Sequence, residues 1–357
     1  MSDSLLFSST NLGPLSLKNR VVMGPMTRSR CIGNVPGEIV AKYYAQRAEA
    51  GLIITEGTSP SPNGLGYARI PGLYNDAQVA GWKGVTDAVH KAGSKIFVQL
   101  MHTGRIGAQE NLPPGAKVFG ASAVQAPGKM YTDAAGMVDH PVPQEFTDAE
   151  VESTIEEYVQ SAKLAIEAGF DGVELHGANG YLIEQFLNVA SNKRSDKWGV
   201  SIENRMRFAV EIAARTAKAI GAEKLGIRVS PYGVFNSMEL DADTDALYLA
   251  LAKKLSELGL AYIHMVDHSA QGAPKPSPEL VKQMREAFKG TFILSGGYDE
   301  KRAEADLQEK RGDLVCFSHK FISNPTLVSK MKSGAALTPP DQATFYTPGE
   351  KGYTDYV

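Results

Sequence analysis

Cysteine is scarce in this chain, which has only Cys31 and Cys316 among its 357 residues. Two thiols so far apart in sequence, with no CxxC spacing, cannot supply the ligands of an iron–sulfur cluster. A reducing setting suits this cysteine content best. We therefore expect a cytoplasmic protein without an iron–sulfur centre.

Long apolar runs are absent as well. No stretch approaches the roughly 18 uninterrupted apolar residues of a membrane span, and residues 1–10 lack the basic start and apolar run of a signal peptide. The formal net charge is -3 and no basic patch indicates nucleic-acid binding. With 43% hydrophobic residues, the chain has enough apolar material for a large core. We expect a globular protein that binds neither membrane nor nucleic acid.

The glycine fingerprint of a dinucleotide-binding fold, GxGxxG after the first strand, is also missing. The chain has instead a repeated unit, in which a short apolar run is followed by a break and then by a segment with helical spacing. Because the runs are apolar throughout, they predict parallel strands that are covered on both faces. The expected strands are residues 21–26, 52–57, 95–101, 172–177, 224–230, 261–267, 291–297 and 314–320.

Eight such units predict a closed (β/α)₈ TIM barrel, and one barrel can occupy residues 1–357 as a single domain. The expected helices are residues 38–50, 77–92, 148–168, 202–220, 243–258, 277–288, 299–308 and 325–331. Asp148 and Ser277 are the expected N-caps of two of them. Residues 103–147, which contain several prolines, are too long for a plain connection and are expected to form a capping excursion after the third strand.

Polar residues gather at the expected C-terminal ends of the strands, where the active sites of such barrels lie. A single Thr, Gln or Arg there is most often structural, so the prediction depends on the set. Gln99 can pair with the pyrimidine edge of a flavin, Arg228 can stabilise negative charge near its N1, and Thr27 can donate to its O4. Gly296 and Gly297 suit a phosphate, although a tight turn explains this pair equally well.

The segment from His176 to Leu187 is the most specific in the chain. His176 and Asn179 offer two donors to one carbonyl or nitro oxygen, which polarises an attached C=C bond. The phenol of Tyr181, with an ordinary pKa of about 10, stays protonated at neutral pH and can donate to the carbon that becomes negatively charged. His176, Asn179 and Tyr181 are therefore the expected catalytic set.

Together these residues resemble the old yellow enzyme family of FMN-dependent ene-reductases. The resembling motifs lie at residues 17–30, 43–48, 51–58, 99–105, 176–187, 192–199, 203–205, 227–231, 324–325 and 352–356, so the resemblance covers nearly the whole chain. It implies a ping-pong enzyme that takes electrons from NADPH or NADH and reduces activated C=C bonds in enones, enals, maleimides and nitro-olefins, with nitro compounds as a further class. It also implies a monomer or a homodimer.

The resemblance assigns roles to individual residues. His176 and Asn179 would bind the substrate oxygen, Tyr181 would donate the proton, and no metal is expected. The residues that would bind FMN are Pro25, Met26, Thr27, Gly57, Gln99, Arg228, Gly296, Gly297, Ser318 and His319. The further residues that would shape the substrate pocket are Tyr67, Met101 and Tyr346.

Three positions depart from the family pattern. The family has Gly-Arg at the end of the eighth strand, where the Arg grips the FMN phosphate, whereas this chain has Ser318-His319-Lys320. Histidine is a weaker and pH-dependent partner for an anion, and Lys320 would point away if the strand alternates. Met101 stands where many relatives have Trp, and Val200 replaces the second glycine of a Gly-Gly-Ser sequence, which we interpret as a structural change.

Two other interpretations remain at this stage. His102, His176, His264, His268 and His319 fall near strand ends, as in a metal-dependent barrel hydrolase, but no HxH lies on the first strand and His264 and His268 do not share a helix face. A flavin-binding protein without catalysis would tolerate the Ser318-His319 change. Such a protein would have no need of the catalytic set, which is complete here.

Overall fold

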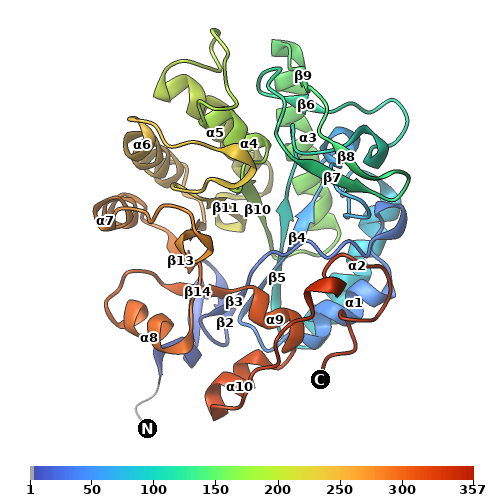
Figure 1. Ribbon diagram of the computed structural model, residues 1–357. Helices are drawn as coiled ribbons and strands as arrows, with labels where there is room; N and C mark the ends of the chain where they lie inside the picture. The colour runs from blue at the N-terminus through green and yellow to red at the C-terminus, as the bar shows by residue number, and fades with distance from the viewer. Residues whose placement is uncertain (1–3) are drawn as a thin grey trace.

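The computed structural model describes residues 4–357 and contains a closed barrel of eight parallel strands (Figure 1). In order round the barrel they are β3 (Val21–Met23), β4 (Leu52–Thr58), β5 (Lys95–Leu100), β10 (Gly172–Gly177), β11 (Leu225–Val229), β12 (Tyr262–Val266), β13 (Thr291–Ser295) and β14 (Leu314–Phe317). β14 pairs with β3 and closes the ring. The predicted TIM barrel is confirmed.

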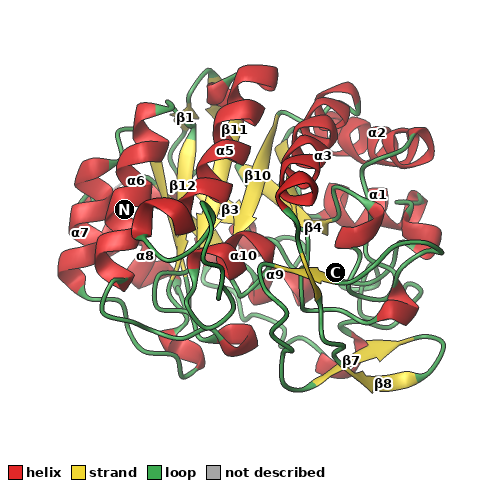
Figure 2. Ribbon diagram, turned by 90° about the horizontal axis from the view of Figure 1, so that it is seen from above, coloured by secondary structure: helices red, strands yellow, loops and turns green. Residues whose placement is uncertain are grey.

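Helices lie outside the strands and form the second layer (Figure 2). They are α1 (Glu38–Gln46), α2 (Asp76–Lys91), α3 (Asp148–Glu167), α4 (Leu182–Leu187), α5 (Ile202–Ile220), α6 (Thr244–Glu257), α7 (Pro278–Ala287), α8 (Glu300–Gln308), α9 (His319–Ser323) and α10 (Leu327–Ser333). Ser277 caps α7 as predicted. The N-cap of α3 is Thr147 and not Asp148, because Thr147 forms a reciprocal capping box with Glu150. No helix within residues 4–357 is long and apolar enough to cross a membrane.

Apolar side chains from the strands fill the barrel interior, among them Ile54, Phe97 and Ile293. A hairpin that the sequence did not predict, β1 (Thr10–Leu12) with β2 (Leu15–Leu17), adds Leu12 and Leu17 to this cluster. The same cluster includes Leu52 and Leu314, the first residues of β4 and β14. The hairpin therefore closes the N-terminal end of the barrel and leaves the opposite end for the site.

Residues 103–147 form the predicted excursion after β5 and carry four short strands. β6 (Phe119–Gly120) pairs with β9 (Gln144–Glu145), and β7 (Lys129–Thr132) forms a hairpin with β8 (Gly136–Asp139) that projects at the edge of the molecule (Figure 2). Met130 of β7 lies in one hydrophobic cluster with Ile106, against Tyr67 and Tyr181. The excursion thus covers part of the C-terminal end of the barrel.

The eighth barrel strand ends at Phe317 and not at residue 320 as predicted. Helix α9 begins at His319, so the alternation expected of a strand does not apply to Lys320. The Lys320 Nζ donates to the Tyr298 carbonyl at 3.0 Å, and its side chain lines the cavity described below. The prediction that Lys320 points away is therefore wrong.

Val200 adopts a backbone conformation that suits glycine, with φ of 72°, and its side chain is exposed. Positive φ costs a β-branched residue about 1–3 kcal/mol, because its Cβ crowds the backbone. Val200→Gly is expected to raise the Tm measured by calorimetry by about 1–3 °C, since the relieved strain exceeds the entropy that glycine loses on folding. The matched control is Val234→Gly at another exposed valine, where φ is -115° and Tm should fall. A lower Tm for Val200→Gly would contradict the strain.

Candidate active site

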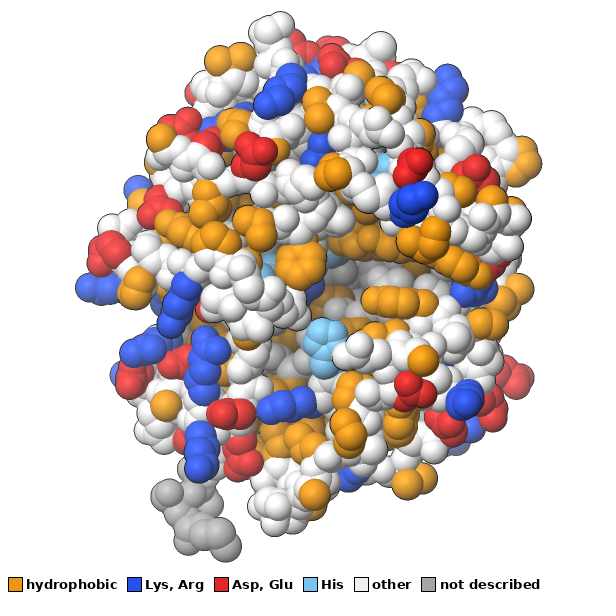
Figure 3. Space-filling view, in the orientation of Figure 1, with side chains coloured by type: hydrophobic (Ala, Val, Ile, Leu, Met, Phe, Trp, Pro, Cys, Tyr) orange, Lys and Arg blue, Asp and Glu red, His pale blue; other side chains and the backbone are white. Residues whose placement is uncertain are grey.

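A cavity of about 440 Å³ opens at the C-terminal end of the barrel, a size typical of small-molecule sites. Its walls come from the ends of the strands and from the C-terminal segment, and they comprise residues 25–27, 67, 179, 181, 228, 235–236, 266–268, 270–271, 295–298, 316–320, 322 and 345–346. Figure 3 shows a hollow near the middle of this face, with hydrophobic and histidine side chains around it.

The structure brings most of the predicted site residues to this cavity. Those that line it are Pro25, Met26, Thr27, Tyr67, Asn179, Tyr181, Arg228, Gly296, Gly297, Ser318, His319 and Tyr346. The other four, Gly57, Gln99, Met101 and His176, are buried behind its walls. Met101 packs against Tyr67 and Tyr181.

Gln99 and Gly57 are partners on the neighbouring strands β5 and β4. The Gln99 side chain is buried, and its Nε2 donates to Glu174 Oε1 at 2.8 Å. A Cβ at Gly57 would overlap the thioether of Met101, so this position needs glycine and offers only its backbone to a ligand. The amide of Gln99 keeps its oxygen free for a second partner.

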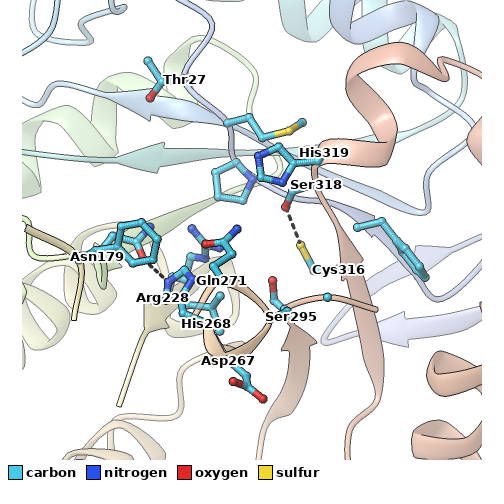
Figure 4. A pocket seen from close by; sticks show the side chains of 18 of the residues that line it. Thr27, Asn179, Arg228, Asp267, His268, Gln271, Ser295, Cys316, Ser318 and His319 are labelled. Atoms are coloured by element: carbon cyan, nitrogen blue, oxygen red, sulfur yellow. Dashed lines mark hydrogen bonds between the residues drawn. The ribbon is translucent and has the colours of Figure 1, made fainter. Parts of the chain in front are cut away.

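Arg228 is a buried cation of the site (Figure 4). It is 6% exposed, and its Nε has no hydrogen-bond partner within residues 4–357. A buried guanidinium without an acceptor is costly, so this residue indicates a ligand that carries acceptors or negative charge. Thr27, Ser318 and Asn179 lie round the same cavity (Figure 4).

The loop after β13 has the backbone that an anion site needs. Gly296 and Gly297 both have positive φ, of 116° and 63°. A Cβ at Gly296 would overlap the backbone of Asp267, so no side chain fits there. Backbone N–H groups can therefore approach a ligand closely at this end of the cavity.

His319 lies at the same end, where its ring stacks on Phe345 with centroids 6.1 Å apart. Burial, and then the charge of Arg28, lower its pKa below the ordinary histidine value, so the ring is neutral at pH 7. Lys320, which the sequence interpretation set aside, is the cation of this segment that lines the cavity.

Tyr181, Tyr67 and His176 form a compact group. The hydroxyls of Tyr181 and Tyr67 are 2.8 Å apart, and the rings of His176 and Tyr181 meet edge to face with centroids 4.9 Å apart. Burial raises the pKa of Tyr181, which keeps the phenol protonated. Burial, and then the charge of Arg228, hold the pKa of His176 well below the ordinary value, so its imidazole is neutral.

Asn179 has a partner that the sequence did not predict. Its Oδ1 lies 2.7 Å from His268 Nε2, in the loop after β12. Burial, and then Arg228, lower the pKa of His268 to about 4, so at neutral pH an Nε2–H tautomer donates to the amide oxygen. The Asn179 nitrogen then keeps both hydrogens for a ligand. The sequence offered His268 only as a possible metal ligand, because nothing local links it to Asn179.

The five histidines near the strand ends have separate surroundings. His102 Nδ1 accepts from the Gly104 amide at 3.0 Å, while His264 Nδ1 pairs with Glu174 at 2.9 Å. His268 contacts Asn179, and His319 stacks on Phe345. Within residues 4–357 no group of three or more His, Cys, Asp or Glu side chains is placed to hold a metal ion.

The donor set of the cavity fits a flavin mononucleotide. Arg228 supplies an unpaired cation, Gly296 and Gly297 supply open backbone, and Thr27 supplies a hydroxyl along one continuous cavity. A ring with several acceptors and a phosphate tail would satisfy all three.

Comparison with known proteins agrees with this fit. The sequence pattern of the NADH:flavin oxidoreductase / NADH oxidase family matches residues 5–338. The chain belongs to this family, the old yellow enzyme family. It is 38% identical to 12-oxophytodienoate reductase 7 of Oryza sativa subsp. japonica, over 98% of this chain and 94% of that protein. It is 39% identical to a probable flavin mononucleotide-dependent alkene reductase of Leishmania infantum, over 97% and 95%.

A solved structure of morphinone reductase in complex with tetrahydroNAD superposes with a TM-score of 0.93 at 42% identity, covering 99% of this chain and 97% of that one. As a member of the old yellow enzyme family, the protein is an NAD(P)H-dependent flavin oxidoreductase with FMN as its cofactor and ene-reductase activity. The cofactors inferred from the resemblance are confirmed.

The neutral His319 leads to a prediction about cofactor retention. His319→Arg is expected to slow FMN release from the holoenzyme several-fold, because an arginine adds a permanent charge and a bidentate fork for phosphate. Release is followed as recovered flavin fluorescence after dilution. His90→Arg on the exposed face of α2 adds the same charge far from the cavity and should leave the release rate unchanged. Equal or faster release from His319→Arg would show that residue 319 does not face the phosphate.

Proposed function

We propose that this old yellow enzyme reduces the activated C=C bonds of enones, enals, maleimides and nitro-olefins in a ping-pong cycle, with nitro compounds as a further class. The observation that carries the proposal is the meeting of a protonated Tyr181, a neutral His176 and an oriented Asn179 beside the unpaired Arg228. FMN supplies the transfer of hydride from NADPH or NADH to the substrate.

Several groups are suited to hold the flavin. Arg228 would stabilise the negative charge of the reduced ring, and Thr27 and the Gln99 side-chain oxygen would bond to its polar edge. The backbone of Gly57 and of the Pro25–Met26 pair would contact the flavin. Residues 296–297 and 318–319 would hold the phosphate, and Lys320 lines the same cavity.

The substrate oxygen lies between His176 and Asn179. A neutral imidazole N–H and an amide N–H, both fixed before the substrate arrives, stabilise the charge that develops on this oxygen. His268 holds the Asn179 amide in the useful orientation. Tyr67, Met101 and Tyr346 bound the space in which the rest of the substrate fits.

Tyr181 is suited to donate the proton to the substrate α-carbon. Its ring packs against His176, and its hydroxyl is held by a hydrogen bond with the hydroxyl of Tyr67. Because the phenol is already in position before the reaction, the entropy cost of orienting the acid does not add to the activation free energy.

The described residues also support one domain. The barrel and the excursion at residues 103–147 share the hydrophobic cluster around Ile106, which supports one domain over residues 1–357. We propose a cytoplasmic enzyme that acts on small molecules as a monomer or homodimer, without a nucleic-acid partner.

A spectroscopic experiment tests the function. The purified protein should show flavin absorbance that bleaches with NADPH or NADH and recovers when 2-cyclohexenone is added without oxygen. Bleaching without recovery across a panel of enones, maleimides and nitro-olefins would favour a flavin protein without ene-reductase catalysis. Comparison of the two nicotinamides in the same assay decides the reductant.

A further inference from the structure

The two cysteines of the chain lie in opposite surroundings. Cys316, near the end of β14, lines the cavity together with Ser295 and Ser318, and its sulfur is 3.8 Å from the Ser318 hydroxyl (Figure 4). Cys31 is completely buried in the main hydrophobic cluster. Only one of the two thiols is therefore placed to meet a molecule in the cavity.

The neighbouring backbone leaves room for this thiol. Gly24 follows β3 and lies beside Cys316 and Ser318 of the neighbouring strand end. A Cβ at this glycine would overlap both the Cys316 sulfur and the Ser318 hydroxyl. The glycine thus allows two polar side chains to lie at the floor of the cavity.

A buried carboxylate and a buried imidazole, those of Glu174 and His264, lie near Cys316. His264 on β12 is completely buried, and its Nδ1 lies 2.9 Å from Glu174 Oε2. Its second nitrogen, Nε2, has no hydrogen-bond partner within residues 4–357, so it is free to take a proton, and its charge acts on the nearby Cys316 thiol. Glu174, His264 and Cys316 therefore follow one another from β10 through β12 to β14, in the order carboxylate, imidazole, thiol.

The charges around the thiol favour its ionised form. Burial alone would raise the pKa of Cys316, but the positive charges of His264 and then Arg228 bring it below the ordinary cysteine value. Burial raises the pKa of Cys31 instead. The other ionisable groups near this cluster are Glu174, the neutral imidazole of His176 and the neutral phenol of Tyr262. Glu174 keeps the pKa of His264 raised against burial.

We propose that Cys316 is a covalent modification site for electron-poor alkenes, with His264 as its base and Glu174 as the residue that positions that base. The sulfur adds to the β-carbon, so that a C–S bond forms as the C=C π bond breaks. The proton that His264 Nε2 takes from the thiol passes to the α-carbon. No oxidant or reductant is required, and the product is a thioether.

The site shares its cavity with the flavin, and this part of the inference rests on the proposed function. Bound FMN would cover Cys316 and protect it, whereas an adduct on Cys316 would fill space that FMN needs. Alkylation is therefore expected to proceed through the fraction of enzyme from which FMN has dissociated. An electrophile of the substrate class would then trap the enzyme in a form without flavin.

The test treats the holoenzyme with N-ethylmaleimide, without nicotinamide, and follows intact mass, peptide maps and released flavin. The expected result is one adduct, on Cys316, with flavin released in step and Cys31 unmodified. Free FMN at about ten times its Kd should slow the adduct about tenfold relative to flavin-free enzyme, because only about one enzyme molecule in eleven then lacks FMN. Labelling of Cys31 ahead of Cys316, or no adduct on Cys316, would overturn the proposal.

Matched variants separate the site from the flavin. Cys316→Ala should abolish the adduct and Cys31→Ala should leave it unchanged. His264→Asn should slow alkylation by roughly 10²-fold and move its pH profile toward that of a free thiol, and Glu174→Gln should slow it less. Alkylation of Glu174→Gln and of folded His264→Asn at the parent rate would overturn the role of the base. If added FMN does not slow formation of the Cys316 adduct, the thiol is still a modification site. The proposal that FMN covers Cys316 would then be contradicted.

Discussion

Tyr181→Phe is expected to leave the reduction of bound flavin by nicotinamide near the parent rate and to slow reoxidation by 2-cyclohexenone, by a few-fold to roughly 10²-fold. Only the second half-reaction needs a proton at carbon, and the substitution removes the acid while it keeps an aromatic ring. Because burial raises the pKa of Tyr181, the parent enzyme should keep this acid protonated through neutral pH. Stopped-flow absorbance measures each half-reaction separately.

Tyr67→Phe is the matched control for this variant. It removes the hydroxyl that bonds to Tyr181 but leaves the Tyr181 phenol in place. The loss in the oxidative half-reaction should therefore be clearly smaller than in Tyr181→Phe. Equal slowing of both half-reactions in Tyr181→Phe would contradict the proton-donor role and make Tyr181 a positioning residue.

Replacement of both His176 and Asn179 by Ala is expected to weaken binding of phenol-like ligands and to slow both half-reactions, with the oxidative one reduced roughly 10²-fold or more. In the proposed function the two side chains donate to the oxygen on which charge develops, and reduced nicotinamide would stack in the same pocket. Ligand titration by flavin absorbance measures the first effect and stopped-flow kinetics the second.

His90→Ala serves as the control, since His90 pairs with Asp171 outside the cavity and should change neither quantity. His176 is neutral at working pH because burial and Arg228 hold its pKa well below the ordinary value. The oxygen-binding step should therefore show no titration of His176 near neutral pH. Retained phenol binding in the double variant would place the substrate oxygen elsewhere.

Local patterns in the sequence were sufficient for the barrel. Eight apolar runs, each followed by a helical segment, imply parallel strands with helices outside, because buried strands need cover on both faces. The ends of two helices also have a local cause: Gly93 and Gly169 follow α2 and α3 with φ of 83° and 89°, which glycine adopts without strain. The Asp148 cap was wrong by one residue, since the capping box depends on the pairing of Thr147 with Glu150.

The tail of the eighth strand shows where local patterns mislead. The apolar residues before Ser318-His319-Lys320 predict a strand through residue 320. The chain instead turns into α9 where the pairing of β14 with its neighbouring strands ends. That turn brings Lys320 to the cavity. Strand length depends on the registers of both neighbours, which residues 314–320 do not contain.

The sequence by itself predicted the chemistry that we propose for the candidate site, because His176, Asn179 and Tyr181 lie within one short segment and their side chains suit the proposed roles. Only the tertiary structure decided what those side chains touch. His268 meets Asn179, Tyr67 meets Tyr181, and the pair of Glu174 and His264 reaches Cys316. These partners come from different strands and loops. Barrel closure brings them together and removes the water that would weaken their mutual effects on pKa.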